Sequence, residues 1–395
     1  MIADLHCHYA MHLLPGDRHP RSHARGWFGR LRDELQAEAL ELLAHAVNDP
    51  GWTAGWRVDL DGLERSGTRL VCSVLYWPYA EFDLDRSYGA SPEPGYFAEL
   101  TDLLERVEQD LREQDPDGRR HKLVTSAADL VDDGRVAFVH CVEGGFHLGP
   151  DAATVDANVG HLAARGVRYI TLAHLFFRGV AANAPAIPLL SDRNYDRLFP
   201  QDDGIGLTPL GRAAVEAMYR HRVLVDVSHM RQDALDATFA LLDELDARHG
   251  ADPRDYPVIA SHIGVRAAGP DSQAYNLSPA TIRRIQERDG LIGLILSQHQ
   301  LGETPDDAAS RAVLGRHIDA IHAVTGTHEH TAIGTDLDGF IKPTLYGLDR
   351  AADLVKLDRW VHEACPSAAE DILSANAQRV LRRVLDSQPA TGRSR

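Results

Sequence analysis

MIADLHC (1–7), the first stretch of the chain, is a short apolar run that reaches His6 and continues into His8. Seven further runs have the same form: each is almost continuously apolar and is flanked by Gly, Pro, Asp or Arg. They are RLVCSVLYW (69–77), VAFVHCV (136–142), VRYITLA (167–173), RVLVDVS (222–228), YPVIASH (256–262), LIGLILS (291–297) and TAIGTDL (331–337). Such runs are typical of strands in a parallel sheet that is covered on both faces.

Segments with helical periodicity lie between these runs. The predicted helices cover 34–47, 97–112, 152–164, 208–220, 231–248, 278–288, 307–324, 349–364 and 367–386. Thr208 and Ser278 each precede a proline, which is the pattern of an N-cap before the first helical residue. Eight strands that alternate with helices predict an α/β fold, a closed (β/α)₈ TIM-type barrel, with an open doubly wound sheet as the alternative.

We expect one catalytic domain over 1–386, with long loops at 10–33 and 178–206, followed by a polar tail at 387–395. The chain has 395 residues, with 41 Lys+Arg against 58 Asp+Glu, so its net charge is −17. This charge argues against nucleic-acid or anionic-membrane binding. The 4 cysteines form no CxxC pair, and no leader or membrane-length apolar stretch is seen, so we expect a cytoplasmic protein.

Residues that can bind metals stand at or just after the end of most of the apolar runs. They are His6, His8, Glu143, His174, His229, His262 and Asp336. All strand carboxyl ends of a parallel barrel lie on one face, so these side chains would converge there, whereas an open sheet would spread them along a line. His140 is three residues from Glu143, points the other way in a regular strand, and is interpreted as a packed structural histidine.

Imidazoles and carboxylates without thiolates suit Zn²⁺, with Mn²⁺ and Co²⁺ as alternatives. Their number exceeds one tetrahedral shell and fits two metal ions bridged by a carboxylate. Such a pair holds a hydroxide at neutral pH and polarises a carbonyl or phosphoryl group. The sequence therefore predicts a binuclear metal hydrolase.

The strand-end residues also resemble those of the amidohydrolase superfamily, and more narrowly those of the membrane (renal) dipeptidase family. The motifs that carry this resemblance occur in the family's order over essentially the whole chain. They are VEGG (142–145), YITLAH (169–174), GLTPLG (206–211), LVDVSH (224–229), ASH (260–262), NLS (276–278), IGTDLDG (333–339) and ANAQRVL (375–381).

The resemblance implies a (β/α)₈ barrel with two zinc ions and a role for each strand-end residue. Glu143 would bridge the metals; His6, His8 and Asp336 would hold the first ion, and His229 and His262 the second. Asp336 would also carry the proton from the bridging water to the leaving amine. His174 would polarise the scissile carbonyl or stabilise the oxyanion.

Two positions depart from the family pattern. The first strand carries HxH instead of the usual HxD, because His8 stands in place of the aspartate. Tyr275 stands just before Asn276, where the family has an arginine that pairs with the substrate's carboxylate, and a phenol cannot supply a charged fork. Tyr275, Asn276 and His174 are therefore candidate substrate contacts, with Arg266 as a candidate replacement cation.

The predicted function is hydrolysis of an amide bond in a dipeptide or a dipeptide-like N-acyl amino acid, a small-molecule substrate. Alternatives are a non-peptide amide, an ester or a phosphoester as substrate, or a non-catalytic metal-binding barrel. A deaminase is disfavoured, because neither His229 nor His262 is followed three residues later by a glutamate. Family members often pair, so a homodimer is compatible, although the sequence does not give the oligomeric state.

Overall fold

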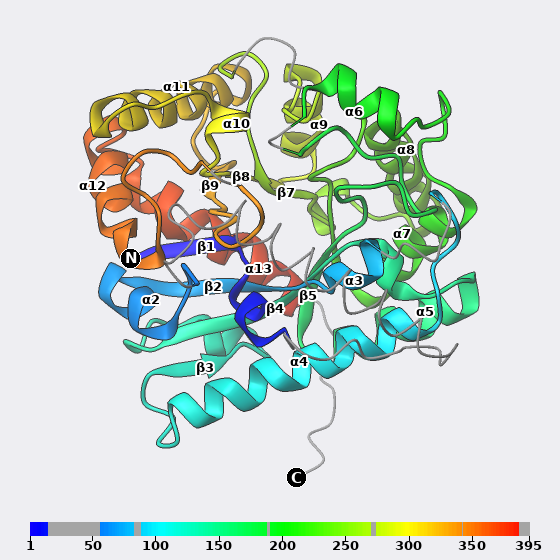
Figure 1. Cartoon of the computed structure of the whole chain (residues 1–395), viewed down its shortest axis with the longest axis horizontal. Helices are drawn as coiled ribbons and strands as arrows, with labels where there is room; N and C mark the ends of the chain where they lie inside the picture. The colour runs from blue at the N-terminus through cyan, green and yellow to red at the C-terminus, as the bar shows by residue number, and fades with distance from the viewer. Residues whose placement is uncertain (15–55, 83–87, 188–189, 270–273, 342, 387–395) are drawn as a thin grey trace, which may run out of the picture.

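The computed structural model describes residues 1–14, 56–82, 88–187, 190–269, 274–341 and 343–386. At its centre lies a barrel of parallel strands surrounded by helices (Figure 1). The barrel strands are β1 (Ile2–Cys7), β2 (Thr68–Leu75), β4 (Val136–Glu143), β5 (Val167–Thr171), β6 (Leu224–Asp226), β7 (Ile259–Ile263), β8 (Leu291–Leu294) and β9 (Thr331–Ile333).

The strands are hydrogen-bonded in the order β2-β1-β9-β8-β7-β6-β5-β4, and pairing of β2 with β4 closes the ring. Each predicted apolar run overlaps one of these strands, so the closed barrel is confirmed and the open sheet is excluded. A further strand, β3 (His121–Leu123), was not predicted. It pairs with the start of β4, and its short HKL sequence carries no apolar pattern.

Each predicted helical segment that the structure describes contains a helix, whereas α2, α3, α6 and α10 were not predicted. Their bounds are α2 (Leu60–Ser66), α3 (Pro78–Glu81), α4 (Gly95–Gln114), α5 (Ala152–Ala164), α6 (Asp192–Leu198), α7 (Pro209–His221), α8 (Gln232–His249), α9 (Pro279–Glu287), α10 (Gln298–Leu301), α11 (Asp307–Thr325), α12 (Leu354–Ala364) and α13 (Asn376–Asp386). A π-helical turn, η6 (Asp371–Ala375), leads into α13. Short 3-10 helices are η1 (Tyr9–Leu13), η2 (Ala127–Leu130), η3 (Gly145–Leu148), η4 (Pro253–Asp255) and η5 (Ala351–Asp353).

Some predicted segments differ from the structure or lie beyond it. The segment 178–206, expected as a long loop, contains α6. The segment 10–33 begins inside η1, and its remainder from residue 15 lies outside the described residues, as do the predicted helix 34–47 and the tail 387–395. None of the described helices is both long and apolar enough to span a bilayer.

Side chains capping the helices bear out two local predictions. The hydroxyl of Thr208 accepts a hydrogen bond from the Gly211 amide at 3.1 Å, and Ser278 accepts from the Thr281 amide at 3.2 Å. Each satisfies an amide in the first turn that has no partner within the helix. The caps fix where α7 and α9 begin.

Two apolar clusters form the core. The larger one lies mainly between the barrel and its helices. The smaller one joins side chains from all eight barrel strands, among them Leu5, Val139 and Ile259, so it fills the barrel interior. The same cluster includes one face of α13, spaced at Ala377, Val380, Leu381, Val384 and Leu385. Helix α13 therefore packs on the floor of the barrel, and the polar site lies at the other end.

Candidate metal centre

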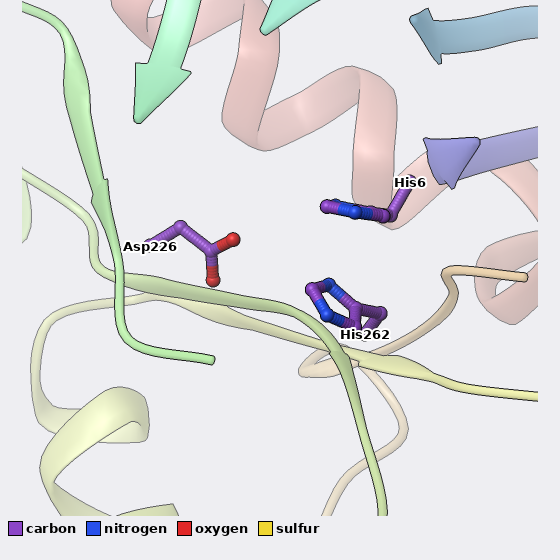
Figure 2. A group of neighbouring side chains, drawn as sticks. All are labelled: His6, Asp226 and His262. Carbon is purple, nitrogen blue, oxygen red and sulfur yellow. The ribbon is translucent and has the colours of Figure 1, made fainter. Parts of the chain in front are cut away.

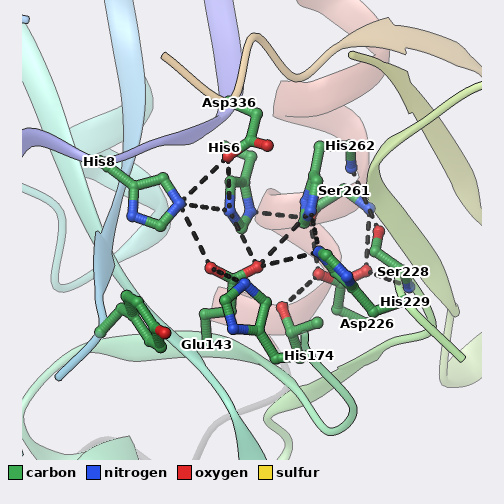
Figure 3. A network of polar contacts seen from close by, with 12 residues as sticks. His6, His8, Glu143, His174, Asp226, Ser228, His229, Ser261, His262 and Asp336 are labelled. Carbon is green, nitrogen blue, oxygen red and sulfur yellow. Dashed lines mark hydrogen bonds and ion pairs between the residues drawn. The ribbon is translucent and has the colours of Figure 1, made fainter. Parts of the chain in front are cut away.

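Glu143 lies at the middle of a buried cluster of ionisable side chains at the carboxyl ends of the strands (Figure 3). Five histidine Nε2 atoms lie close to its carboxylate oxygens. They belong to His6 (3.4 Å), His8 (3.3 Å), His174 (3.2 Å), His229 (3.6 Å) and His262 (3.5 Å). Asp336 Oδ1 is 3.1 Å from His8 Nε2 and 3.7 Å from His6 Nε2. The structure thus brings together all the residues that the sequence placed at this centre.

Regular strand alternation explains the position of Glu143. Ala137, Val139 and Cys141 of β4 belong to the interior cluster, and Glu143 continues this series at the end of the strand. His140 lies on the other face, where its Nε2 is 3.6 Å from Glu108 of α4. His140 is therefore packed against the helix layer, as its spacing from Glu143 predicted.

The arrangement of these atoms fits two metal positions. The carboxylate oxygens of Glu143 and Oδ1 of Asp336 are buried and receive no hydrogen bond of ordinary geometry from any described residue. The Nε2 atoms of His229 and His262 are 2.8 Å apart, and those of His6 and His8 are 3.3 Å apart. Two imidazoles that bind one zinc ion at about 2.0–2.1 Å in tetrahedral geometry have nitrogens roughly 3.3 Å apart. The donors thus form two sets on either side of Glu143.

The protonation states in the cluster favour metal binding. Burial alone would raise the pKa of Glu143, but the histidines, with His174 and His6 foremost, hold it well below its usual range. Burial, reinforced by neighbouring imidazoles, lowers the pKa of His229 and of His262 well below the usual histidine value. An anionic carboxylate and neutral imidazoles are the forms that donate electron pairs to a metal.

The negative charges around His8 favour a positive charge at this position. Burial would lower the pKa of His8, yet Asp336 and Glu143 raise it to about 10. Burial also raises the pKa of Asp336. Two buried carboxylates so close together are costly unless a positive charge lies between them. A divalent ion supplies that charge without a proton.

Asp226 lies beside His6 and His262, with its carboxylate directed toward them (Figure 2), and it was not predicted as a site residue. Its side chain groups with His6 and His262, whose Nε2 atoms point the other way, toward Glu143. The Asp226 carboxylate already accepts four hydrogen bonds. They come from the amides of Ser228 (3.0 Å) and Ser261 (2.9 Å) and from the hydroxyls of Ser261 (2.6 Å) and Thr171 (2.5 Å). We interpret Asp226 as an anchor for the histidines and not as a ligand.

Ser261 connects this anchor to both donor sets. Its hydroxyl donates to Asp226 and lies 2.9 Å from His6 Nδ1 and 2.8 Å from His262 Nδ1. The Tyr169 hydroxyl is also 3.0 Å from His6 Nδ1 and donates to the Leu5 carbonyl. Such partners fix the tautomer and orientation of metal-binding histidines.

Comparisons with known proteins agree with this geometry. The sequence model of the membrane dipeptidase family (peptidase family M19) matches residues 39–394. The chain belongs to this family. It is a hydrolase of the metallodipeptidase type, a class that implies divalent metal ions and a small peptide substrate.

Relatives in the family are distant in sequence. The chain is 27% identical over 264 residues to the "Uncharacterized protein in pqqA 5'region" of Klebsiella pneumoniae, covering 64% of this chain and 83% of the relative. It is 26% identical over 254 residues to "Dipeptidase aclJ" of Aspergillus oryzae, covering 63% of this chain and 51% of the relative. The chain thus spans about half the length of the Aspergillus protein.

Two solved structures share the fold. One is a metallopeptidase from Rhodobacter sphaeroides liganded with a phosphinate mimic of the dipeptide L-Ala-D-Ala. Its TM-score is 0.66 at 18% identity, with 97% of this chain and 99% of that chain covered. The other is dipeptidase AC, with a TM-score of 0.65 at 20% identity, covering 88% of this chain and 96% of that chain.

Tyr275, which we expected to stand in place of an arginine of the membrane dipeptidase family, is buried beside the centre. The Tyr275 ring lies 4.9 Å, centroid to centroid, from that of His229, and its hydroxyl donates to the His262 carbonyl at 2.8 Å. Asn276 is buried, and its amide donates to the Gln300 carbonyl at 2.8 Å. Within the described part of the chain, neither the Tyr275 hydroxyl nor the Asn276 amide is hydrogen-bonded to a carboxylate of the centre; both bind backbone carbonyls.

Arg266 has a similar supporting position. It is exposed, and one Nη donates to the carbonyls of Asn276 (3.1 Å) and Ala274 (3.4 Å). These bonds tie Arg266 to the segment that carries Tyr275. Of the four residues predicted to contact substrate, His174 and Tyr275 therefore lie directly beside the metal ligands.

The backbone at two predicted ligands is strained. His229 and Asp336 have φ values of 64° and 56°, a region that costs energy for residues other than glycine. Next to Asp336, a Cβ at Gly339 would lie 1.8 Å from Asp336 Oδ1 and 2.8 Å from His8 Cδ2. The close approach therefore requires glycine at position 339.

Glu81 is the other functional residue that sequence reasoning missed. Its carboxylate is fully buried and lies 2.6 Å from His174 Nδ1. Burial lowers the pKa of His174, but the charges of Glu143 and Glu81 outweigh it and raise the pKa. For Asp226 the sequence did contain a signal, because this acid interrupts the apolar run RVLVDVS (222–228). Glu81 follows a strand in the segment WPYAE (77–81) and carried no comparable signal.

Proposed function

We propose that the protein is a dipeptidase that binds two divalent ions, with Zn²⁺ preferred, and hydrolyses the amide bond of a dipeptide or a dipeptide-like N-acyl amino acid. The observation that carries the proposal is the convergence of five imidazole nitrogens on the buried Glu143 carboxylate. A carboxylate flanked by two imidazole pairs is the expected environment of a bridging ligand. Membership in the membrane dipeptidase family supports the same reading.

In this proposal each side chain has a defined role at the metals. His6, His8 and Asp336 hold one ion, and His229 and His262 hold the other. Glu143 bridges them. When bound, the ions supply Lewis acidity, which lowers the pKa of water and polarises a carbonyl group.

The remaining steps belong to the protein's own side chains. Asp336 accepts the proton from the attacking water and passes it to the leaving amine; its Oδ1 receives no ordinary hydrogen bond from the described residues. His174 donates from Nε2 to the carbonyl oxygen as negative charge develops there, because its Nε2 faces the centre, 3.2 Å from Glu143.

The substrate contacts follow from the surroundings of the centre. Tyr275 contacts the substrate beside His229, but its hydroxyl hydrogen is committed to the His262 carbonyl. Asn276 and Arg266 hold the backbone next to it, and Arg266 remains the candidate cation for a substrate carboxylate. No buried arginine fork is seen at these positions, so we expect the protein to bind a substrate carboxylate more weakly than such a fork would.

A metal and substrate test decides the proposal. Activity on dipeptides should disappear with a chelator and return with Zn²⁺, at about two ions per chain. The panel should include a D-residue at the C-terminal side, because the Rhodobacter sphaeroides structure contains a mimic of L-Ala-D-Ala. Each dipeptide should be paired with its C-terminal amide to measure the contribution of the carboxylate.

The outcomes separate the alternatives. Turnover that is indifferent to chelation would refute the metal mechanism. Cleavage of amides or esters with all free dipeptides inert would refute the dipeptide assignment. Asp336→Asn should abolish turnover while the metal remains bound; a non-catalytic barrel would have no turnover to lose.

A further inference from the structure

Glu81, at the end of α3, has a buried carboxyl group next to His174. Its side chain is fully buried, so its polar atoms need hydrogen-bond partners within the protein. Three donors surround the carboxylate. Oε2 accepts from the Tyr76 hydroxyl at 2.6 Å and lies 2.6 Å from His174 Nδ1, and Oε1 accepts from the Phe176 amide at 2.8 Å. With its oxygens occupied in this way, Glu81 is not available as a metal ligand.

The contact with Glu81 determines how the His174 ring is held. The Glu81 oxygen accepts this hydrogen bond, so His174 Nδ1 carries one hydrogen, in addition to the hydrogen on Nε2 that the proposed donation to the carbonyl oxygen requires. This leaves Nε2 directed toward the centre, 3.2 Å from Glu143 Oε2. The ring of Tyr76 packs edge-on against His174, with centroids 4.6 Å apart and planes at 70°. The ring is therefore restrained on its edge and on its face.

The backbone around Glu81 is tied to the same loop. Besides accepting from the Phe176 amide, Glu81 receives Arg178 on its main-chain carbonyl, with Nε at 2.7 Å and a second contact from Nη2. The loop after β5, which carries His174, is thus joined to the corner after β2 through both the side chain and the main chain of Glu81. A displacement of Glu81 would move His174 directly.

We propose that Glu81 is the positioning residue for His174: it holds the imidazole by its Nδ1 hydrogen so that Nε2 faces the scissile carbonyl. The inference rests on the proposed function, because the role of His174 at the carbonyl belongs to it. A carboxylate that orients a catalytic imidazole in this way supports catalysis through geometry, without touching the substrate. Glu81 therefore contributes to turnover and little to metal or substrate binding.

The test compares Glu81→Gln with a matched exposed variant, Glu105→Gln on α4. We expect Glu81→Gln to lower kcat by about 10–100-fold, as for other residues that orient site histidines, with KM and metal content unchanged. Glu105→Gln should leave all three unchanged. In a His174→Ala background, Glu81→Gln should lower kcat no further, because residues that act through one another are not additive.

A spectroscopic measurement is independent of turnover. The protein is labelled with ¹⁵N-histidine and loaded with metal, and the His174 resonances are assigned by their loss in His174→Ala. These resonances should show a hydrogen on Nδ1. They should change in Glu81→Gln. Three results would each overturn the proposal. They are unchanged His174 resonances in Glu81→Gln, a loss of kcat by Glu81→Gln that is as large in the His174→Ala variant as in the wild type, and a loss of metal from Glu81→Gln. If the wild-type protein cleaves no dipeptide, the proposed function fails, and the resonances still decide the position of His174.

A conservative variant covers the case in which Glu81→Gln does not fold. Glu81→Asp keeps the acceptor and shortens it by one methylene. It should retain the Nδ1 hydrogen, lower kcat less than the expected effect of Glu81→Gln, and again have no effect in the His174→Ala background. An effect that persists in that background would assign Glu81 a purely structural role.

Discussion

Replacing Ser261 with alanine should weaken the two metal positions unequally. The hydroxyl of Ser261 lies 2.8 Å from His262 Nδ1 and 2.9 Å from His6 Nδ1. Without it, His6 keeps the Tyr169 hydroxyl at 3.0 Å. His262 Nδ1 has no other hydrogen-bond acceptor among the described residues. The ion held by His262 should therefore lose more affinity than the ion held by His6.

The size of the effect follows from the cost of an unpaired buried donor. Leaving one buried N–H group without an acceptor costs about 1–3 kcal/mol, which is roughly 5–150-fold in an equilibrium constant. Loss of partners behind metal-binding histidines usually costs about 10–100-fold in affinity. We expect a loss of about 10–100-fold at the His229–His262 position and of less than about 5-fold at the His6–His8 position, because His6 retains one acceptor.

Calorimetric titration of the metal-free protein with Zn²⁺, fitted to two sites, measures both affinities. Tyr169→Phe is the matched variant: it removes the other acceptor of His6 while Ser261 still serves both histidines. It should change neither affinity by more than about 5-fold. Equal weakening of both positions in Ser261→Ala, or no weakening at all, would refute the reasoning.

Three further predictions concern the centre and the stability of the fold. Gly339→Ala should remove metal and lower activity by about 100-fold or more, because its Cβ would collide with Asp336; metal analysis and turnover check this. Burial lowers the pKa of His317 to about 4, so the unfolded state binds more protons below pH 6.5, and stability should fall as pH drops from 6.5 to 4. The loss reaches roughly 3 kcal/mol and should be absent in His317→Gln by urea unfolding at several pH values. Finally, chelation should lower the melting temperature measured by calorimetry, because ions that bind only the folded state stabilise it; an unchanged value would argue against the site.

The sequence predicted the barrel because each strand is an almost continuous apolar run. The helix bounds follow from caps such as Thr208 and Ser278, and α5 coincides with its prediction at 152–164. Strand β3 was missed because His121 and Lys122 give it no apolar pattern. Its pairing with β4 is decided by tertiary contacts, which no local pattern reports.

The residues that gather at the candidate metal centre were predictable because they lie at or just after the ends of strands and match family motifs. Glu81 and Asp226 were harder to predict for different reasons. Asp226, the last residue of β6, lies within the apolar run 222–228, where an acid is unusual, and its role depends on Ser261 of the neighbouring strand. Glu81 reaches His174 across 93 positions of chain. Only the fold determines such a distance, so motif reasoning cannot find it.

The centre also requires strands that do not alternate regularly. In β1, Ala3 and Leu5 belong to the barrel interior, yet His6 and His8 also face inward, which a strict period of two forbids. The pairing of β1 with β2 accordingly shifts register between Asp4 and Cys7. A β-bulge of this kind re-aims side chains beside an active site.

Buried aspartates hold both irregularities in place. Asp4 accepts from the His6 amide at 3.1 Å and from the Thr335 amide at 2.9 Å. In β7, where the register shifts between Ala260 and Ile263, Asp226 accepts from the Ser261 amide at 2.9 Å. Each carboxylate thus binds an amide at an irregular point of the strand, where an unpaired buried amide would be costly. The two aspartates therefore let successive residues of one strand serve both the apolar interior and the metal centre.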